Sequence, residues 1–135
     1  MDKIFIDTDV SLDLLSERLP YYAHAAQLFT LADRGKLLIY VSSLSFSNLN
    51  YLLSKQYSQK DARRILSKFK VLVNVLSVDD KIIGLSLNSV FRDFEDAIQY
   101  YTSIENNINT FITRNLKDYR QADIAVMTAE DFLSF

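Results

Sequence analysis

The sequence Lys3-Ile-Phe-Ile-Asp-Thr-Asp-Val10 lies at the start of the chain and joins an apolar segment to two acidic residues. Its apolar residues predict a short buried strand over residues 3–6, and Asp7 and Asp9 follow directly. A carboxylate just past the carboxyl end of an apolar strand is a common arrangement in α/β ligand sites. Burying such a charge is unfavourable unless another group compensates it, so Asp7 requires partners from elsewhere in the chain.

Length and composition define the class of protein. The chain has 135 residues, of which 49% are apolar and 24% charged, with no cysteine, one histidine and a formal net charge of −2. We expect one globular domain over residues 1–135, with no signal peptide and no membrane span. The absence of cysteine excludes disulfides and thiolate metal sites, and one histidine excludes a multi-histidine zinc site. A reducing, cytoplasmic setting is therefore expected.

Short apolar stretches alternate along the chain with longer amphipathic ones. The predicted strands are residues 3–6, 37–41, 70–76, 110–113 and 124–127. The predicted helices are 9–18, capped by Asp9 or Ser11; Pro20 to Gly35; one after Ser43; 59–69; one with a capping box of Ser77 and Asp80; one opening at Asp93; and 128–133. Because this alternation is typical of βαβ units, we expect an α/β fold with three α/β/α layers around a central parallel sheet of about five strands.

Three stretches bring acidic or amide groups to the expected carboxyl edge of the sheet. They are Asp7 with Asp9, Arg92–Ala97 and Thr113–Asp118. Within the second stretch, Asp93 and Asp96 are three residues apart on the opening turn of a helix, which places them on one face. Oxygen-rich clusters of this kind, without His or Cys, suit Mg²⁺ or Mn²⁺. Such an ion meets phosphate oxygens and activates water for attack on a phosphodiester.

Each of these residues also has a plainer interpretation. Asp9 and Asp93 are acceptable helix caps, and Asp118 is an acceptable turn residue. Asn48 shares a helical stripe with leucines, so it is either a buried amide bonded to the backbone or a neutral member of the site. Asp7 is harder to explain in this way, because its position at the end of a strand requires compensation.

The same motifs resemble those of PIN domains, in order along the whole chain. Ile4–Val10 is similar to the opening hhhDTNV motif, with Asp9 where Asn is usual, and Val41–Asn48 is similar to the second motif, which ends in Glu in most members. Asp93–Tyr100 resembles the third motif and Phe111–Tyr119 the fourth, and Met127–Leu133 is also similar. The resemblance implies a PIN-like fold for residues 1–135.

The resemblance also implies a function. PIN domains of this kind are metal-dependent ribonucleases that act on RNA with Mg²⁺ or Mn²⁺, most often as VapC-type toxins of toxin–antitoxin pairs. Such toxins are typically homodimers, held inactive by a small antitoxin protein whose tail occupies the acidic groove. By this resemblance the chain is expected to have an RNA substrate, an antitoxin partner and a second copy of itself.

Residue by residue, the resemblance makes Asp7 and Asp96 the main metal ligands. The second acid of the family falls on Asn48 and the fourth on Asn115, both of which are neutral in this chain. Asp118, three residues past Asn115, is the expected source of the missing charge. Asp93 is expected to join the metal site through Asp96.

The first function hypothesis is an active endoribonuclease. Asp7, Asp96 and Asp118 are its predicted catalytic residues and, with Asp93, its predicted metal ligands. The residues expected to support the site or contact substrate are Asp9, Asn48, Thr113, Arg114 and Asn115, with Arg114 or Lys117 on the RNA backbone.

Two alternatives remain. Because Asn48 and Asn115 are neutral, the chain is alternatively a catalytically weak PIN fold that binds RNA or a protein partner. A phosphoacceptor signalling domain would also place acids at a sheet edge. That class has a lone Asp after the third strand and a Lys after the fifth, and neither is evident after Leu76 or Met127, so it ranks last.

Overall fold

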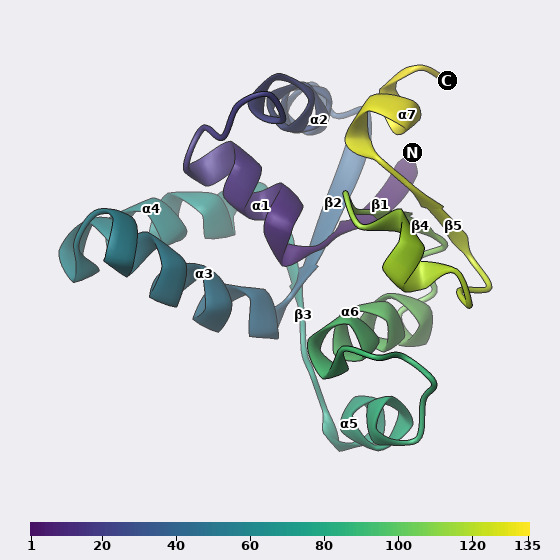
Figure 1. Ribbon diagram of the computed structural model, residues 1–135. Helices are drawn as coiled ribbons and strands as arrows, with labels where there is room; N and C mark the ends of the chain where they lie inside the picture. Colours follow the sequence, from purple (N-terminus) through teal and green to yellow (C-terminus); the bar gives the residue numbers. More distant parts are fainter.

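The computed structural model describes residues 1–135 and contains one five-stranded sheet (Figure 1). The strands are β1 (Asp2–Ile6), β2 (Leu37–Ser42), β3 (Asn74–Leu76), β4 (Thr110–Ile112) and β5 (Ala125–Met127). Their order in the sheet is β3-β2-β1-β4-β5, and every neighbouring pair is parallel. The predicted parallel α/β sheet is confirmed, and the strand that precedes Asp7 is its central strand.

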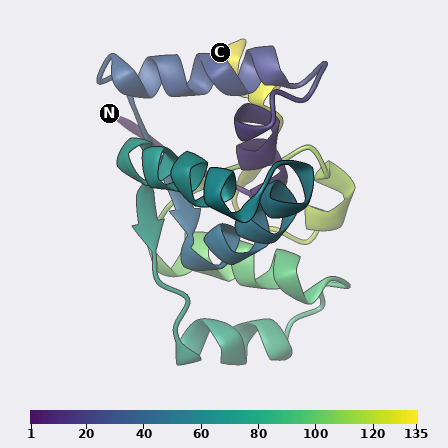
Figure 2. The same cartoon turned by 90° about the vertical axis from the view of Figure 1, so that its left-hand side faces the viewer.

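Seven α-helices and one 3₁₀ helix connect the strands. They are α1 (Thr8–Leu15), α2 (Tyr22–Asp33), α3 (Ser43–Gln56), α4 (Gln59–Leu72), α5 (Asp80–Leu87), α6 (Phe94–Glu105), the 3₁₀ helix η1 (Leu116–Tyr119) and α7 (Ala129–Leu133). Helices α1 to α4 lie on one side of the sheet and α5 and α6 on the other, which confirms the three layers (Figure 1). In the turned view, α2 and α5 form opposite ends of the molecule (Figure 2). None of these helices has the length and apolar content that crossing a bilayer requires.

The side chains of β1 alternate between the two layers. Ile4 and Ile6 belong to the larger core, beneath α1 to α4, whereas Phe5 belongs to the smaller core beneath α6. All three are fully buried, as expected for the central strand of a parallel sheet. In the smaller core Phe5 stacks on Phe111 of β4, with 5.2 Å between ring centroids. Apolar contacts on both faces therefore fix the end of β1, where Asp7 begins.

Side-chain caps begin every α-helix except α2. The cap residues are Asp7, Ser42, Ser58, Asp79, Asp93 and Thr128. The predicted starts at Asp93 and Thr128 are confirmed. The prediction of Asp9 or Ser11 as the first cap is wrong, because the Asp7 carboxylate accepts the bond from the Val10 amide. The predicted capping box of Ser77 and Asp80 is also wrong, because Asp79 caps α5.

The third predicted strand is wrong over residues 70–73. Helix α4 continues to Leu72, and β3 begins only at Asn74. The buried residues Ala62, Leu66, Phe69 and Val73 follow one another at helical spacing, so this stripe prevails over the strand preference of the valines. The other helices differ from their predicted bounds by a few residues. The helix predicted over 9–18 spans Thr8–Leu15, and the one predicted from Pro20 begins at Tyr22. The helix predicted over 59–69 ends at Leu72.

The smaller core gives a prediction for stability. Phe111 is fully buried between Phe5 and Tyr119, so Phe111→Ala is expected to lower the free energy of unfolding by about 3–5 kcal/mol. Phe135 is 93% exposed, and Phe135→Ala is the matched control, with a change of about 0.5 kcal/mol or less. Urea denaturation followed by circular dichroism measures both. Equal midpoints for the two variants would contradict this account of the core.

Candidate functional site

Asp7 links the central strand to the helix that follows it. Its carboxylate Oδ1 accepts a hydrogen bond from the Val10 amide at 3.0 Å, which caps α1. The other oxygen, Oδ2, accepts a bond from the Thr113 hydroxyl at 2.5 Å, just past the end of β4. Only 6% of Asp7 is exposed. Two neighbouring strands therefore hold this carboxylate at the carboxyl edge of the sheet.

Burial has the largest effect on the pKa of the Asp7 carboxylate. Desolvation raises the pKa of Asp7 from 3.8 to about 7, although the bonds from Thr113 and Val10 act in the opposite direction. The neighbouring carboxylates of Asp9 and Asp96 raise the pKa further. A carboxylate whose proton affinity is raised in this way gains free energy when a cation takes the place of the proton.

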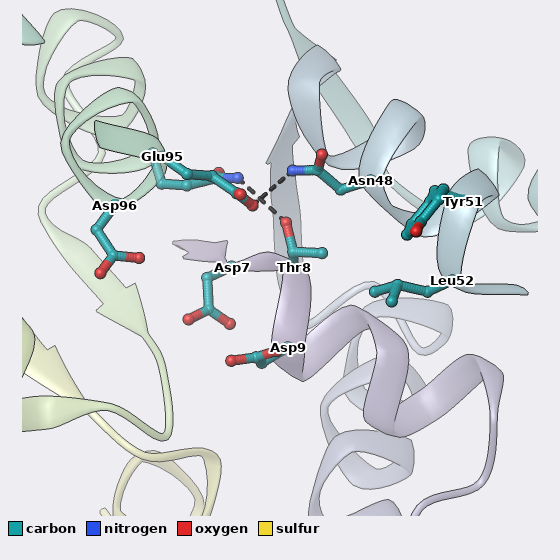
Figure 3. A pocket seen from close by; sticks show the side chains of 9 residues that line it. Asp7, Thr8, Asp9, Asn48, Tyr51, Leu52, Glu95 and Asp96 are labelled. Carbon is teal, nitrogen blue, oxygen red and sulfur yellow. Dashed lines mark hydrogen bonds between the residues drawn. The ribbon is translucent and has the colours of Figure 1, made fainter. Parts of the chain in front are cut away.

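Asp96 belongs to the first turn of α6 and faces the same cavity as Asp7 (Figure 3). Burial and the neighbouring Asp93 raise the pKa of Asp96 to about 6. The buried hydroxyl of Tyr119 lies beside the Asp96 carboxylate and opposes this rise in its pKa. Asp7 and Asp96 thus both have raised pKa values, although they come from elements that are far apart in the sequence.

A hydrogen-bonded network of neutral side chains lies next to these acids. Thr8 of α1, Ser45 of α3 and Gln99 of α6 are all buried and bond to one another at 3.0–3.2 Å. The amide nitrogen Nε2 of Gln99 serves both hydroxyls, whereas its oxygen Oε1 is buried without a partner. This network fixes three helices around the cavity and leaves one acceptor unused there.

Two further contacts join an amide to a carboxylate. The Asn48 Nδ2 of α3 donates to Glu95 Oε1 of α6 at 2.5 Å, as Figure 3 shows. The Asn115 Nδ2 donates to Asp9 Oδ2 at 3.2 Å. Burial, together with the neighbouring Asp93 and Asp9, raises the pKa of Glu95.

The predicted acids and Asn48 are divided between two adjoining cavities, whereas Asn115 lines a third cavity together with Arg114. The first, of 310 Å³, is lined by Asp7, Thr8, Asp9, Asn48, Tyr51, Leu52, Glu95, Asp96 and Gln99. The second, of 540 Å³, is lined by Val90, Arg92, Asp93, Asp96, Lys117, Asp118, Arg120 and Gln121. Asp96 lines both cavities and is the link between Asp7 and the pair Asp93 and Asp118. Asp93 also caps α6, which is the plainer role considered for it.

Arg114 lies outside both cavities. Its guanidinium forms a bidentate ion pair with the carboxylate of Asp13, at 2.8 and 3.2 Å, and lies 4.1 Å from the ring centre of Tyr21. Asp13 is only 2% exposed and has a second basic neighbour, Arg18, at 3.8 Å. Arg114 therefore compensates a buried charge in α1, whereas Lys117, the other basic residue predicted to contact substrate, lines the second cavity.

The charges of the first cavity have no such compensation. None of Asp7, Asp9, Glu95 and Asp96 forms an ion pair with a lysine or arginine. No three Asp, Glu or His side chains converge closely enough to hold an ion by themselves. Magnesium nevertheless commonly uses one or two carboxylates and keeps several waters, so this donor set fits a hydrated divalent cation. The unused acceptor Oε1 of Gln99 is consistent with that fit.

The predicted site omitted several residues that the structure brings to it. Glu95 stands between two residues that were predicted, Asp93 and Asp96, so its acidic character was a usable signal. Gln99 was noted only as part of a motif. Tyr119 ends the predicted fourth motif, but its place beside Asp96 depends on a contact between distant residues that no local pattern shows.

The profile of the PIN domain family matches residues 3–117. The chain therefore belongs to the PIN domain family, and the resemblance of its motifs is confirmed.

Known proteins are similar to the chain over nearly its full length. Ribonuclease VapC1 from Aquifex aeolicus (strain VF5) is 27% identical, over 97% of this chain and 93% of that protein. A DNA-bound VapBC structure from Salmonella typhimurium is 16% identical, with a TM-score of 0.73, over 94% of this chain and 97% of that one. A toxin–antitoxin complex from Klebsiella pneumoniae is 23% identical, with a TM-score of 0.69, over 93% and 97%. The two structures confirm the fold.

The raised pKa of Asp7 predicts an unusual pH dependence in the presence of a chelator. Because the folded protein holds this proton up to about pH 7 and the unfolded chain releases it near pH 3.8, the contribution of Asp7 to stability is lost as the pH rises between these values. The loss is on the order of 2–4 kcal/mol. Asp7→Asn keeps the cap of α1 and is expected to remove the loss, so the variant is the more stable protein at pH 8.

The measurement is urea denaturation between pH 4 and pH 8 in EDTA, for the wild type and for Asp7→Asn. Asp33→Asn, an exposed change at the end of α2, serves as the control and should follow the wild type. A constant difference between wild type and Asp7→Asn over this pH range would contradict the assignment of a raised pKa to Asp7.

Proposed function

We propose that this chain is a divalent-metal-dependent endoribonuclease and the toxin of a toxin–antitoxin pair. The observation that carries the proposal is the buried carboxylate of Asp7, which lines an acidic cavity with Asp96 and has no basic partner. Membership of the PIN domain family and the similarity to Ribonuclease VapC1 support it. The class of reaction is hydrolysis of an RNA phosphodiester.

Asp7 and Asp96 are the proposed ligands of Mg²⁺ or Mn²⁺. A bound divalent ion lowers the pKa of water and neutralises charge that develops on the phosphate. The bonds from Val10 and Thr113 fix the orientation of the Asp7 carboxylate, and the α6 cap fixes the turn that carries Asp96. Asp93 and Asp118, in the adjoining cavity, are proposed as acidic residues that act with Asp96 on the same substrate.

Side chains on both sides of the acids suit an RNA strand. Tyr51, 59% exposed, lines the first cavity, and the Lys55 ammonium lies 4.5 Å from its ring centre. Arg92, Lys117 and Arg120 line the second cavity. An exposed aromatic ring stacks on a base, and lysine or arginine contacts the phosphates. We propose that the RNA crosses both cavities, with the scissile phosphate at Asp96, which they share.

The alternative is a catalytically weak PIN fold that binds RNA or protein, as Asn48 and Asn115 suggest. In the structure both amides are bonded to carboxylates of the same region, which favours the active enzyme. A weak fold retained for binding would not need to bury Asp7 without a partner, because the buried charge destabilises the protein.

Cleavage of RNA by the purified protein tests the enzymatic proposal. With Mn²⁺ and single-stranded or structured RNA, the wild type is expected to cleave, and Asp7→Asn to lower the rate at least about 100-fold, since even indirect neighbours of a metal contribute about 10–100-fold. Asp33→Asn, with the same change of charge far from the site, is expected to keep the wild-type rate. Equal cleavage by wild type and Asp7→Asn, or cleavage by neither, would refute the proposal.

Growth of the host cell tests the toxin role. Expression of the chain alone is expected to arrest growth, and expression of Asp7→Asn is not. Co-expression of a small DNA-binding protein encoded next to the gene is expected to relieve the arrest and to co-purify with the chain. We propose a homodimer for the free toxin, and sedimentation measures its mass. Growth that is equal for wild type and Asp7→Asn would argue against the toxin role.

A further inference from the structure

Two amide–carboxylate bonds cross the region of the proposed metal site. Asn48 of α3 is bonded to Glu95 of α6, and Asn115, after β4, is bonded to Asp9 of α1. In each pair the two residues come from different elements, and both carboxylates line the cavity of Asp7. Figure 3 shows the first pair on the opposite side of Asp7 from Asp9.

The positions of these amides are the ones at which the motifs led us to expect acids. Asn48 stands where the second acid was expected, and Asn115 where the fourth was expected. In both cases the residue that accepts the hydrogen bond from the amide is an acid. Asn48 is bonded to Glu95, and Asn115 is bonded to Asp9. Asp9 in turn stands where the first motif usually has asparagine. Compared with the PIN motifs, each hydrogen-bonded pair thus has its acid on the other partner. The pair still contributes one carboxylate, so the number of carboxylates is the same as in the motifs.

The chemistry of the pairs leaves each carboxylate available. An asparagine amide donates one N–H to one oxygen, while the second oxygen and the remaining lone pairs stay free for another ligand. Neither Glu95 nor Asp9 has a basic partner that would occupy those positions. The amide therefore orients the carboxylate without neutralising its charge.

An independent feature of the same cavity indicates a ligand. Gln99 is 2% exposed and lines this cavity, and its Oε1 is buried without any hydrogen-bond partner. Leaving a buried acceptor unpaired destabilises a protein by about 1–3 kcal/mol. A hydrated cation in the cavity would supply donors to Oε1, because its bound waters present their hydrogens outward.

We propose that Glu95 and Asp9 supply the remaining negative charge around a hydrated divalent cation held by Asp7 and Asp96, acting on it through its bound waters, and that Asn48 and Asn115 are positioning residues that orient these two carboxylates. This inference rests on the proposed function, because it concerns the same metal site. It assigns the role of two absent acids to residues on the other side of each hydrogen bond. Asn48 and Asn115 then do not indicate a lost site.

Binding of Mn²⁺ to the metal-free protein tests the inference without reference to activity. Isothermal calorimetry and the electron paramagnetic resonance signal of free Mn²⁺ both report the dissociation constant. Glu95→Gln and Asp9→Asn keep an acceptor for the amide and remove only the charge. Each is expected to weaken Mn²⁺ binding about 10-fold or more, in the range found for residues around metal sites. Glu95→Asp keeps the charge but shortens the side chain, and is expected to weaken binding as well.

Exchange of the residues within a pair is the decisive variant. Asn48→Asp combined with Glu95→Gln moves the carboxylate to α3 at unchanged side-chain lengths, and Asn115→Asp combined with Asp9→Asn moves the other to the residue after Arg114. Each exchange keeps the net charge and the hydrogen bond. Each is expected to restore Mn²⁺ affinity to within about threefold of the wild type, a difference below about 0.7 kcal/mol. Thermal unfolding of every variant confirms that it is folded.

The outcomes separate this inference from the proposed function. Glu130→Gln, a change on an exposed residue of α7, is the control and should bind as the wild type does. If Asp7→Asn abolishes binding while Glu95→Gln and Asp9→Asn bind normally, the metal site stands and this inference fails. It also fails if the exchanges bind no better than the single variants, or if Glu95→Asp binds normally. If the wild type binds no Mn²⁺, the metal-dependent function fails as well.

Discussion

Asp7 is buried at the end of the central strand, and its position determines how the other residues of the site are arranged around it. Its two oxygens are used structurally, by the first turn of α1 and by Thr113 after β4, so the carboxylate is fixed where the sheet ends. Neither bond removes the electrostatic penalty of burial, since the pKa of Asp7 is raised to about 7. The fold therefore fixes the Asp7 carboxylate in a position where desolvation makes its charged form unfavourable.

A second buried acid, Asp13 in the helix that Asp7 caps, shows how the fold compensates a buried charge with basic side chains. Asp13, six residues after Asp7, is held by the fork of Arg114 and has Arg18 nearby. Removal of one partner from a buried ion pair lowers the stability of a protein by about 3–5 kcal/mol. This cost is the reason that the Arg114 guanidinium uses two of its nitrogens on Asp13. The chain thus provides basic partners for Asp13 and none for Asp7. This contrast within α1 is the physical reason to treat Asp7 as a binding group.

The sequence was informative where a local pattern determines the structure. The apolar stretch before Asp7 and the alternation of strands and helices predicted the sheet. The acids at three strand or helix ends predicted most of the carboxylates that line the two cavities. The third strand was misplaced because a helical stripe ending at Val73 competed with a valine-rich run. The pairs of Asn48 with Glu95 and Asn115 with Asp9 join residues 47 and 106 positions apart, so no local pattern contains them.

Helix N-termini also act on the charges of the site. Helices α1, α3 and α6 all begin near the carboxyl edge of the sheet, and each N-terminus is equivalent to roughly half a positive charge. Together they offer roughly one and a half charges to the four carboxylates of the Asp7 cavity, which leaves roughly two and a half negative charges when all are ionised. A single divalent cation brings that region close to neutrality, whereas one lysine would not. The charge of the site therefore matches an ion of charge two.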